Sequence, residues 1–210
     1  GTGLGRVNGS INIGNSNVSN FEGDIAKFSF YEHALSAEDV AINFMAVSAP
    51  DAGRIELGSN GDDVVTGATG NDVISGGTGD DYLQGLTGND NYLYNRGEGQ
   101  DTISETGGDA DIVNFGDINH DALWFSQSGD DLDITVVGTD DTLTIQDWYS
   151  DSTARIEAFA TTEDGRGLMG NQVEQLVSAM ASYAVPSGSG NVIPQDTKDA
   201  LQPVLAASWY

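Results

Sequence analysis

The sequence predicts an all-β protein: a right-handed parallel β-roll, followed by a β capping segment and a short C-terminal helix, and preceded by separate N-terminal strands. Three observations predict this fold class. The middle of the chain repeats every nine residues, glycine is abundant at 28 residues, and short β-branched runs separated by glycine turns follow the repeat. With 210 residues, the chain is long enough for one large or two small domains.

The repeat occupies residues 58–93 and reads GSNGDDVVT, GATGNDVIS, GGTGDDYLQ and GLTGNDNYL. Positions 1 and 4 are always Gly, position 5 is Asp or Asn, and position 6 is always Asp. Position 8 is apolar or aromatic in every copy: Val65, Ile74, Leu83 and Tyr92. A flexible Gly/Asp-rich linker is the alternative, but a linker has no reason to place an apolar residue at every eighth position.

Each nonapeptide predicts a six-residue turn and a three-residue strand whose middle side chain points inward. Nine residues then make half a coil, so two repeats complete one turn of a flattened solenoid. Stacked turns place carboxylates and backbone carbonyls around a gap lined only by oxygen. Such a gap favours calcium, which takes six to eight oxygen ligands at about 2.3–2.6 Å, over magnesium with its strict octahedral geometry.

These nonapeptides resemble the RTX (haemolysin-type) repeat G-G-x-G-x-D-x-U-x, in which calcium lies between adjacent turns. In three of the four copies the second Gly of that pattern is replaced, by Ser59, Ala68 and Leu86. The resemblance implies several calcium ions, with the position-6 carboxylates as ligands helped by the turns. The residues predicted to form these metal sites are Asp63, Asp72, Asp81, Asp90, Asp62, Asp80, Asn60, Gly61, Gly70, Gly79 and Gly88.

The pattern of Gly turn, Asp and short strand continues after the repeat with altered spacing, as RGEGQDTI at 96–103 and GGDADIVNF at 107–115. This stretch resembles the segment that follows RTX repeats in secreted proteins. It predicts a second group of calcium ligands, Asp101, Glu105, Asp109 and Asp111. The alternative is an acidic, solvated turn without metal.

The charge supports a cation partner. Seven Lys and Arg stand against 33 Asp and Glu, a formal net charge of -26, and 19 of the 24 Asp lie between residues 51 and 151. Such self-repulsion disfavours a compact state unless cations neutralise it. It also argues against nucleic acid and anionic membranes as partners, because both require clustered basic residues.

Three β-rich runs follow at 122–127, 132–137 and 142–148. We expect Trp124, Phe125, Trp148 and Tyr149 to cover the open end of the solenoid, since a terminal coil otherwise exposes its core. An aromatic platform for carbohydrate is the alternative use of these four residues. Residues 155–159 and the turn at 163–167 extend the capping segment.

The C-terminal forty residues predict a helix over 172–183, a linker at 186–194 and a loosely held apolar tail. RTX proteins as a family leave the cell through a type I secretion channel, using an uncleaved C-terminal signal. The resemblance therefore implies that the C-terminus meets the type I secretion machinery. A plain capping helix followed by a disordered tail is the alternative.

The first fifty residues form a different unit, with strands at 11–15 and 21–31 and a short helix at 37–45. The run from Gly9 to Ser36 resembles the last strands of a laminin G/concanavalin A-like sandwich. It covers only the closing third of such a domain, so no ligand site is carried over. The predicted units are residues 1–50, the calcium-binding roll at 51–115, the cap at 116–170, and the helix and tail at 171–210.

No catalytic centre is expected. His33 and His120 are the only His residues, and both are predicted to be surface residues. The chain has no Cys, so disulfides and thiolate zinc sites are excluded. We expect no cleavable signal peptide and no membrane-spanning segment in this stretch, and the start at Gly1 suggests that it comes from a longer protein, so the missing targeting segment says nothing about where that protein goes.

The predicted function is that of the calcium-binding C-terminal module of an extracellular or cell-surface bacterial adhesin. The module would stay unfolded without calcium for type I secretion and fold on binding calcium outside the cell. The N-terminal strands would belong to a part that recognises a glycan or protein. The alternatives are the non-catalytic tail of a secreted hydrolase and a carbohydrate-binding module.

Overall fold

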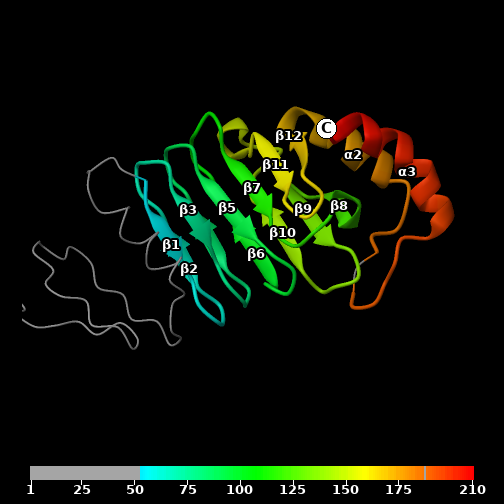
Figure 1. The fold of residues 1–210 in the computed structure, drawn as a ribbon. Coiled ribbons are helices and arrows are strands. Elements are labelled where there is room, and N and C mark those ends of the chain that lie inside the picture. The colour runs from blue at the N-terminus through cyan, green and yellow to red at the C-terminus, as the bar shows by residue number, and fades with distance from the viewer. Residues whose placement is uncertain (1–52, 187) are drawn as a thin grey trace, which may run out of the picture.

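The computed structural model describes residues 53–186 and 188–210 (Figure 1). The strands and helix expected in the first fifty residues, and His33, lie outside this part of the chain. The strands are β1 (Ile55–Leu57), β2 (Val64–Thr66), β3 (Val73–Ser75), β4 (Tyr82–Gln84), β5 (Asn91–Tyr94), β6 (Gln100–Ile103), β7 (Ile112–Phe115), β8 (Leu123–Ser128), β9 (Asp131–Val136), β10 (Thr142–Ile145), β11 (Ala158–Thr161) and β12 (Arg166–Met169). The helices are α2 (Val173–Met180) and α3 (Gln195–Ser208), with short 3-10 turns η1 (His120–Ala122), η2 (Ser152–Ala154) and η3 (Gly170–Gln172).

The strands form two six-stranded sheets, in the orders β1-β3-β5-β7-β11-β12 and β2-β4-β6-β10-β9-β8. Successive strands of the repeat alternate between the sheets, as expected when nine residues make half a coil. Val64 accordingly pairs in parallel with Tyr82, and Val73 with Asn91, two nonapeptides further along. The predicted all-β class is confirmed.

The sheets are mixed, because the strands beyond the repeat reverse direction. Strand β9 runs antiparallel to both β10 and β8, and β12 runs antiparallel to β11. Parallel pairing is therefore confined to β1-β3-β5-β7-β11 in one sheet and to β2-β4-β6-β10 in the other. The antiparallel strands end each sheet at the C-terminal side (Figure 1).

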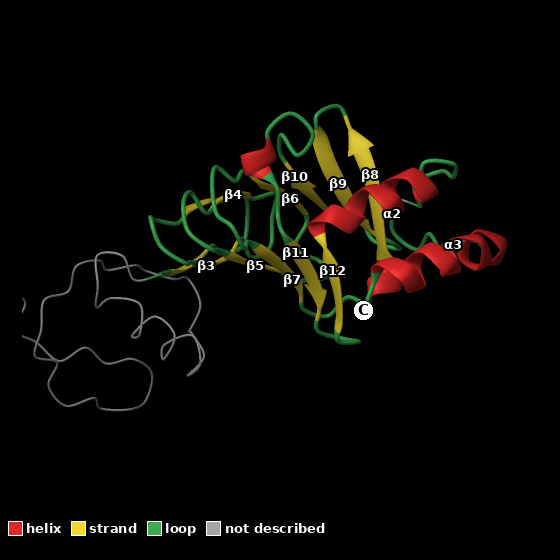
Figure 2. Ribbon diagram, turned by 90° about the horizontal axis from the view of Figure 1, so that it is seen from above, coloured by secondary structure: helices red, strands yellow, loops and turns green. Residues whose placement is uncertain are grey.

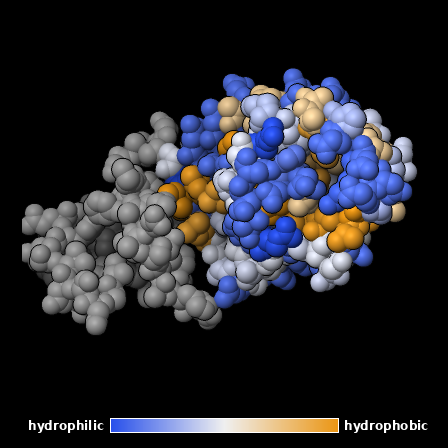
Figure 3. Space-filling view, turned by 45° about the vertical axis from the view of Figure 1, so that its right-hand side comes forward, coloured by the Kyte–Doolittle hydropathy of each residue, from blue (hydrophilic) through white to orange (hydrophobic). Residues whose placement is uncertain are grey.

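The core of the repeat region lies between the two sheets and is built from position 8. Ile74, Leu83 and Tyr92 are buried, whereas the residues on either side of them are only partly covered. This alternation is the one predicted from a strand with a single inward side chain. At the β1–β2 end, Val64 is 73 % exposed, and apolar residues show at this edge of an otherwise largely hydrophilic face (Figure 3).

The predicted aromatic lid is present and buried. Phe159 packs edge-on against Phe125, with ring centroids 5.9 Å apart, and lies 6.1 Å from the Trp148 ring. Trp124 is buried beside them in the same core, and Tyr149 packs against it partly buried. Because the Trp and Phe rings are buried, they cannot form an exposed platform for carbohydrate, and that alternative is wrong for them.

The C-terminal segment differs from the loosely held tail that was expected. Residues Gln195–Ser208 form α3, which packs against α2 at the end of the sheets away from β1 (Figure 2). Leu201 and Leu205, one helical turn apart, are buried, and Trp209 is only 2 % exposed. Apolar residues at this spacing form a stripe that gains stability by packing, and the cap supplies the surface for it. Within the described residues, no helix combines the length and apolar character needed to cross a membrane.

Candidate metal centre

The turns before the strands stack into two columns. The first turn column contains the turns that lead to Asp72, Asp90 and Asp111, just before β3, β5 and β7. The second turn column contains the turns that lead to Asp63, Asp81 and Asp101, at the start of β2, β4 and β6. Coil stacking therefore brings residues 18 to 21 positions apart side by side.

In Asp81, Asp90, Asp101 and Asp111, one carboxylate oxygen accepts from the previous coil. In the first turn column, the amide of Asp72 donates to Oδ1 of Asp90, and the amide of Asp90 to Oδ1 of Asp111, both at 2.7 Å. In the second, the amide of Asp63 donates to Oδ1 of Asp81 at 2.8 Å, and the amide of Asp81 to Oδ1 of Asp101 at 3.1 Å. These bonds fix the carboxylates along the columns.

The second oxygen of four of these carboxylates is buried and accepts no hydrogen bond within the described residues. These atoms are Oδ2 of Asp81, Asp90, Asp101 and Asp111. Burying a charged oxygen without a partner is costly, and proteins normally satisfy such atoms. The chemistry of the unpaired atoms therefore fits a hard cation.

Three carboxylates of the first turn column converge most closely. Asp90, Glu105 and Asp111 each offer an oxygen within 4.8 Å of the others, and they are 0 %, 3 % and 1 % exposed. The amide of Ser104 donates to the carbonyl of Leu83 at 2.9 Å, and this register places Glu105 next to Gly85 of the previous coil. Glu105 therefore takes the place of the first Gly of a repeat. The hydroxyl of Tyr92, from the core position, donates to Oε1 of Glu105.

Burial also changes the proton affinity of these groups. It raises the pKa of Asp101 and of Glu105 to about 7 and that of Asp111 to about 6, with smaller contributions from neighbouring carboxylates. The pKa values of Asp81 and Asp90 are raised for the same reason. A bound cation would favour the charged forms and reverse this effect.

The position-4 glycines let successive turns approach closely. Gly88 has a φ of +131°, and a Cβ on it would overlap the carbonyl of Gly70 one coil away. Gly79 has a φ of +137° and would likewise overlap Gly61. Their predicted role as ligands through the backbone stays a prediction, but the structure gives a steric reason for Gly at this position.

Several predicted ligands lie elsewhere on the turns, in an exposed ladder of their own. The amide of Asp80 donates to Oδ1 of Asp62 at 3.0 Å, and the amide of Asp109 to Oδ1 of Asn89 at 3.2 Å. Oδ1 of Asn60 accepts from the hydroxyl of Thr78 at 3.1 Å. The position-5 side chains and Asn60 are therefore separated from the buried cluster of position-6 carboxylates.

Three acidic residues outside the predicted ligand set, Glu98, Asp141 and Glu157, also lie near these columns. Glu98 is buried and accepts from the backbone and side-chain nitrogens of Asn95, both at 2.8 Å. Asp141 is buried and accepts from the amide of Gly97 at 2.8 Å. Glu157 accepts from the amide of Asp111 at 2.7 Å. The available signal for Glu157 was an acidic residue just before a strand, as in each repeat.

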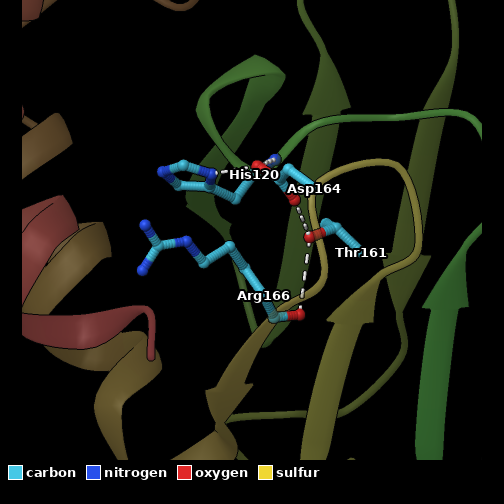
Figure 4. Close-up of polar contacts among 4 residues, drawn as sticks. All are labelled: His120, Thr161, Asp164 and Arg166. Carbon is cyan, nitrogen blue, oxygen red and sulfur yellow. Dashed lines mark hydrogen bonds and ion pairs between the residues drawn. The ribbon is translucent and has the colours of Figure 1, made fainter.

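His120 belongs to a structural contact in the cap (Figure 4). Its Nδ1 pairs with Oδ2 of Asp164, and Oδ1 of Asp164 accepts from the hydroxyl of Thr161 at 2.6 Å. The imidazole ring lies 5.6 Å from the ring of Trp209. The side chain of His120 is therefore only partly exposed and connects η1 to the β11–β12 turn and the C-terminus.

Comparison with known protein families agrees with this geometry. Residues 57–92 match the family described as RTX calcium-binding nonapeptide repeat, in four copies. Residues 131–162 match the family described as haemolysin-type calcium binding protein related domain. The first match covers β2 to β4, the start of β5 and their turns, and the second covers β9 to β11.

Proposed function

We propose, from the premise that this chain is an RTX repeat protein, that calcium ions between its stacked turns hold the repeat region together as a parallel β-roll. One observation carries the proposal most directly. Four buried carboxylates of the two turn columns, Asp81 and Asp90 in the repeats and Asp101 and Asp111 after them, each keep an oxygen without a hydrogen-bond partner in the described part of the chain. A calcium ion would supply the positive charge that these oxygens lack.

The residues fit calcium better than other metals. The columns offer carboxylate and backbone oxygens, and the chain contains no Cys. A flexible, all-oxygen ligand set is typical of calcium, whereas magnesium keeps its water and requires a stricter geometry. In the first turn column, Asp72, Asp90, Glu105 and Asp111 would hold ions; in the second, Asp63, Asp81 and Asp101 would do so.

Calcium binding would also decide when the chain folds. Without calcium, the net charge of -26 and the buried carboxylates oppose compaction. The sites are assembled from separate coils and so do not exist in the unfolded chain, which makes binding energy into folding energy. Extracellular modules bind calcium with dissociation constants of about 10⁻⁴–10⁻³ M, so the roll would fold outside the cell and not inside.

This behaviour suits export through a type I secretion channel, with the C-terminus recognised first and the chain threaded unfolded. We place the module at the end of a large adhesin, because the run from Gly9 to Ser36 resembles the last strands of a laminin G/concanavalin A-like domain. The module itself would have no catalytic role. Its localisation would be extracellular or at the cell surface.

The test is far-UV circular dichroism with thermal melting, first in EGTA and then across a calcium titration to about 10 mM. We expect a cooperative gain of β signal and a large rise in melting temperature with calcium, and neither with magnesium. A spectrum that is already fully folded in EGTA, with a melting temperature indifferent to calcium, would overturn both the metal sites and the export mechanism.

A further inference from the structure

The first turn column continues one step beyond the repeats and into the cap. Strand β7 pairs in parallel with β11, and Ile112 lies opposite Ala158. One coil earlier, Asn91 lies opposite Ile112 in the same way. Glu157 therefore follows Asp90 and Asp111 at the position that Asp occupies in every repeat, although 46 residues separate it from Asp111.

The hydrogen bonds repeat as well. The amide of Asp111 donates to Oε2 of Glu157 at 2.7 Å, the same step that joins Asp72 to Asp90 and Asp90 to Asp111. The amides of Glu157 and Ala158 both donate to the carbonyl of Asp111 at 3.1 Å. Glu157 thus reproduces the backbone contact of a repeat Asp with one additional methylene group.

A second, independent feature lies beside this contact. Oδ2 of Asp111 is buried and accepts no hydrogen bond from the described residues, and Asp111 is 1 % exposed. None of the ion pairs in the described part of the chain involves Asp111 or Glu157. The column therefore ends with two adjacent carboxylates and an unpaired oxygen, the arrangement found at its earlier steps.

The second turn column stops at Asp101. Strand β6 pairs in parallel with β10, and Asp101 lies opposite Leu143, which is fully buried in the core. A Leu side chain has no ligand atom. The two columns therefore differ at the junction with the cap: the first supplies a carboxylate at the register position of the repeat Asp, whereas Asp141 of the second lies two residues before Leu143 and accepts from the amide of Gly97 instead.

We propose that Glu157 is a metal ligand, and that a calcium ion held by Asp111 and Glu157 joins the repeat region to strand β11 of the cap. This inference rests on the proposed function and adds a site that the repeat pattern alone does not contain. Strand β11 pairs with β12, and Gly167 of β12 exchanges two backbone hydrogen bonds with Tyr210. Calcium at this junction would therefore order the cap as far as the C-terminus.

The chain supplies its own reporter for this step. Its three Trp residues, Trp124, Trp148 and Trp209, are all buried in the cap, and none lies in the repeats. Phe159 of β11 contacts the Trp148 ring. Tryptophan emission therefore follows packing of the cap, while far-UV circular dichroism and the number of bound ions follow the whole module.

The experiment compares the whole chain with E157Q, E157D and the exposed control E163Q, using equilibrium dialysis with calcium and tryptophan emission during the titration. Gln can still accept the Asp111 amide, so E157Q removes charge and keeps the backbone contact. We expect E157Q to bind one ion fewer and to need roughly tenfold more calcium for the emission change. E157D carries the residue that the repeats use at this position, so it should bind as many calcium ions per chain as the chain without substitution. E163Q should do the same.

The outcomes separate this inference from the proposed function. An unchanged stoichiometry and emission midpoint in E157Q would overturn the assignment of Glu157 while leaving calcium binding by the repeats intact. A loss of the ion in E157D as well as in E157Q would also overturn it, because packing rather than the carboxylate would then be responsible. If the chain without any substitution bound no calcium, the proposed function itself would be overturned.

Discussion

Tyr92 donates its hydroxyl to the carboxylate of Glu105, which joins the core of the repeat region directly to its most acidic turn. Tyr92 occupies the position that is Val, Ile or Leu in the other repeats, and Glu105 occupies the position that is Gly. Both departures occur on the same step of the first turn column. Together they bring a third carboxylate to Asp90 and Asp111, so this step has more negative charge than its neighbours.

The contact between Tyr92 and Glu105 should therefore stabilise the fold most when calcium only partly occupies its sites. We expect Y92F to lower the free energy of unfolding by about 1–3 kcal/mol, because it leaves a buried carboxylate oxygen without its donor. The loss should be smaller with saturating calcium, which satisfies Glu105 by itself. Urea unfolding at the lowest calcium concentration that supports folding and at saturating calcium measures both values. Y82F is the control, since that hydroxyl bonds only to partly buried Gln146 at 3.0 Å, and an equal loss in both variants would contradict the prediction.

The separation between position 5 and position 6 can be tested with two matched substitutions. We expect D90N to weaken calcium-dependent folding by about tenfold or more in calcium concentration, because it removes a buried charge from the densest cluster. Asn can still accept the Asp72 amide through its side-chain carbonyl, so the coil contact is retained. D62N changes an exposed carboxylate and should shift the midpoint by less than about twofold. Calcium titration followed by circular dichroism decides, and equal shifts would assign the position-5 residues to the sites as well.

Protonation and calcium should act in opposite directions on stability. The pKa values of Asp101 and Glu105 are raised to about 7 in the fold, above their ordinary values of 3.8 and 4.5. A carboxyl group with a raised pKa stabilises the fold below its unfolded value, and this contribution is lost as pH rises through the folded value. Protonation should therefore let the calcium-free protein fold at pH 5, with a melting transition that is lost toward pH 8.

Calcium reverses this order because it binds the charged form. Its affinity should rise between pH 5 and pH 8, and binding near pH 6.5 should release protons, measurable by calorimetry in buffers of different ionisation enthalpy. Melting curves in calcium-depleted buffer provide the other half of the test. A calcium-free melting temperature that is flat or rises across this range would contradict the burial of these carboxylates.

The repeat region was predictable in detail because each nonapeptide carries its own turn, strand and core residue. The apolar residue at position 8 predicts the core, and the Asp at position 6 predicts the turn columns. Both predictions follow from the same nine-residue pattern. Glu157 and Asp141 were not predictable in the same way. Their places depend on β11 and β10 pairing with strands about forty residues earlier, and no local period records such a register.

Helix α3 was not predicted, for a related reason. Residues 195–208 contain polar and apolar residues in nearly equal numbers and include Pro203, which removes a backbone donor from the helix interior. The apolar side chains of Leu201, Leu205 and Trp209 stabilise this helix only when α2 and the cap are present to cover them. Tertiary packing therefore decides this helix, and propensity alone favours a tail.

The last prediction concerns that packing. Trp209 is buried beside Phe125, with ring centroids 6.3 Å apart, and beside His120. We expect W209A to destabilise the cap by about 3–5 kcal/mol, the usual cost of removing a large buried aromatic side chain. V192A, at a side chain that is 74 % exposed, is the control and should change little.

Thermal melting in calcium, followed by tryptophan emission, measures this loss, and the bound-ion count shows which part of the module is affected. We expect W209A to retain the ions of the repeats, because the rings that Trp209 packs against, those of Phe125 and His120, belong to the cap. A melting temperature unchanged by W209A would mean that the C-terminal residues are held loosely after all. In that case the C-terminus would remain accessible in the folded protein, whereas the buried arrangement requires unfolding before a partner can reach Trp209.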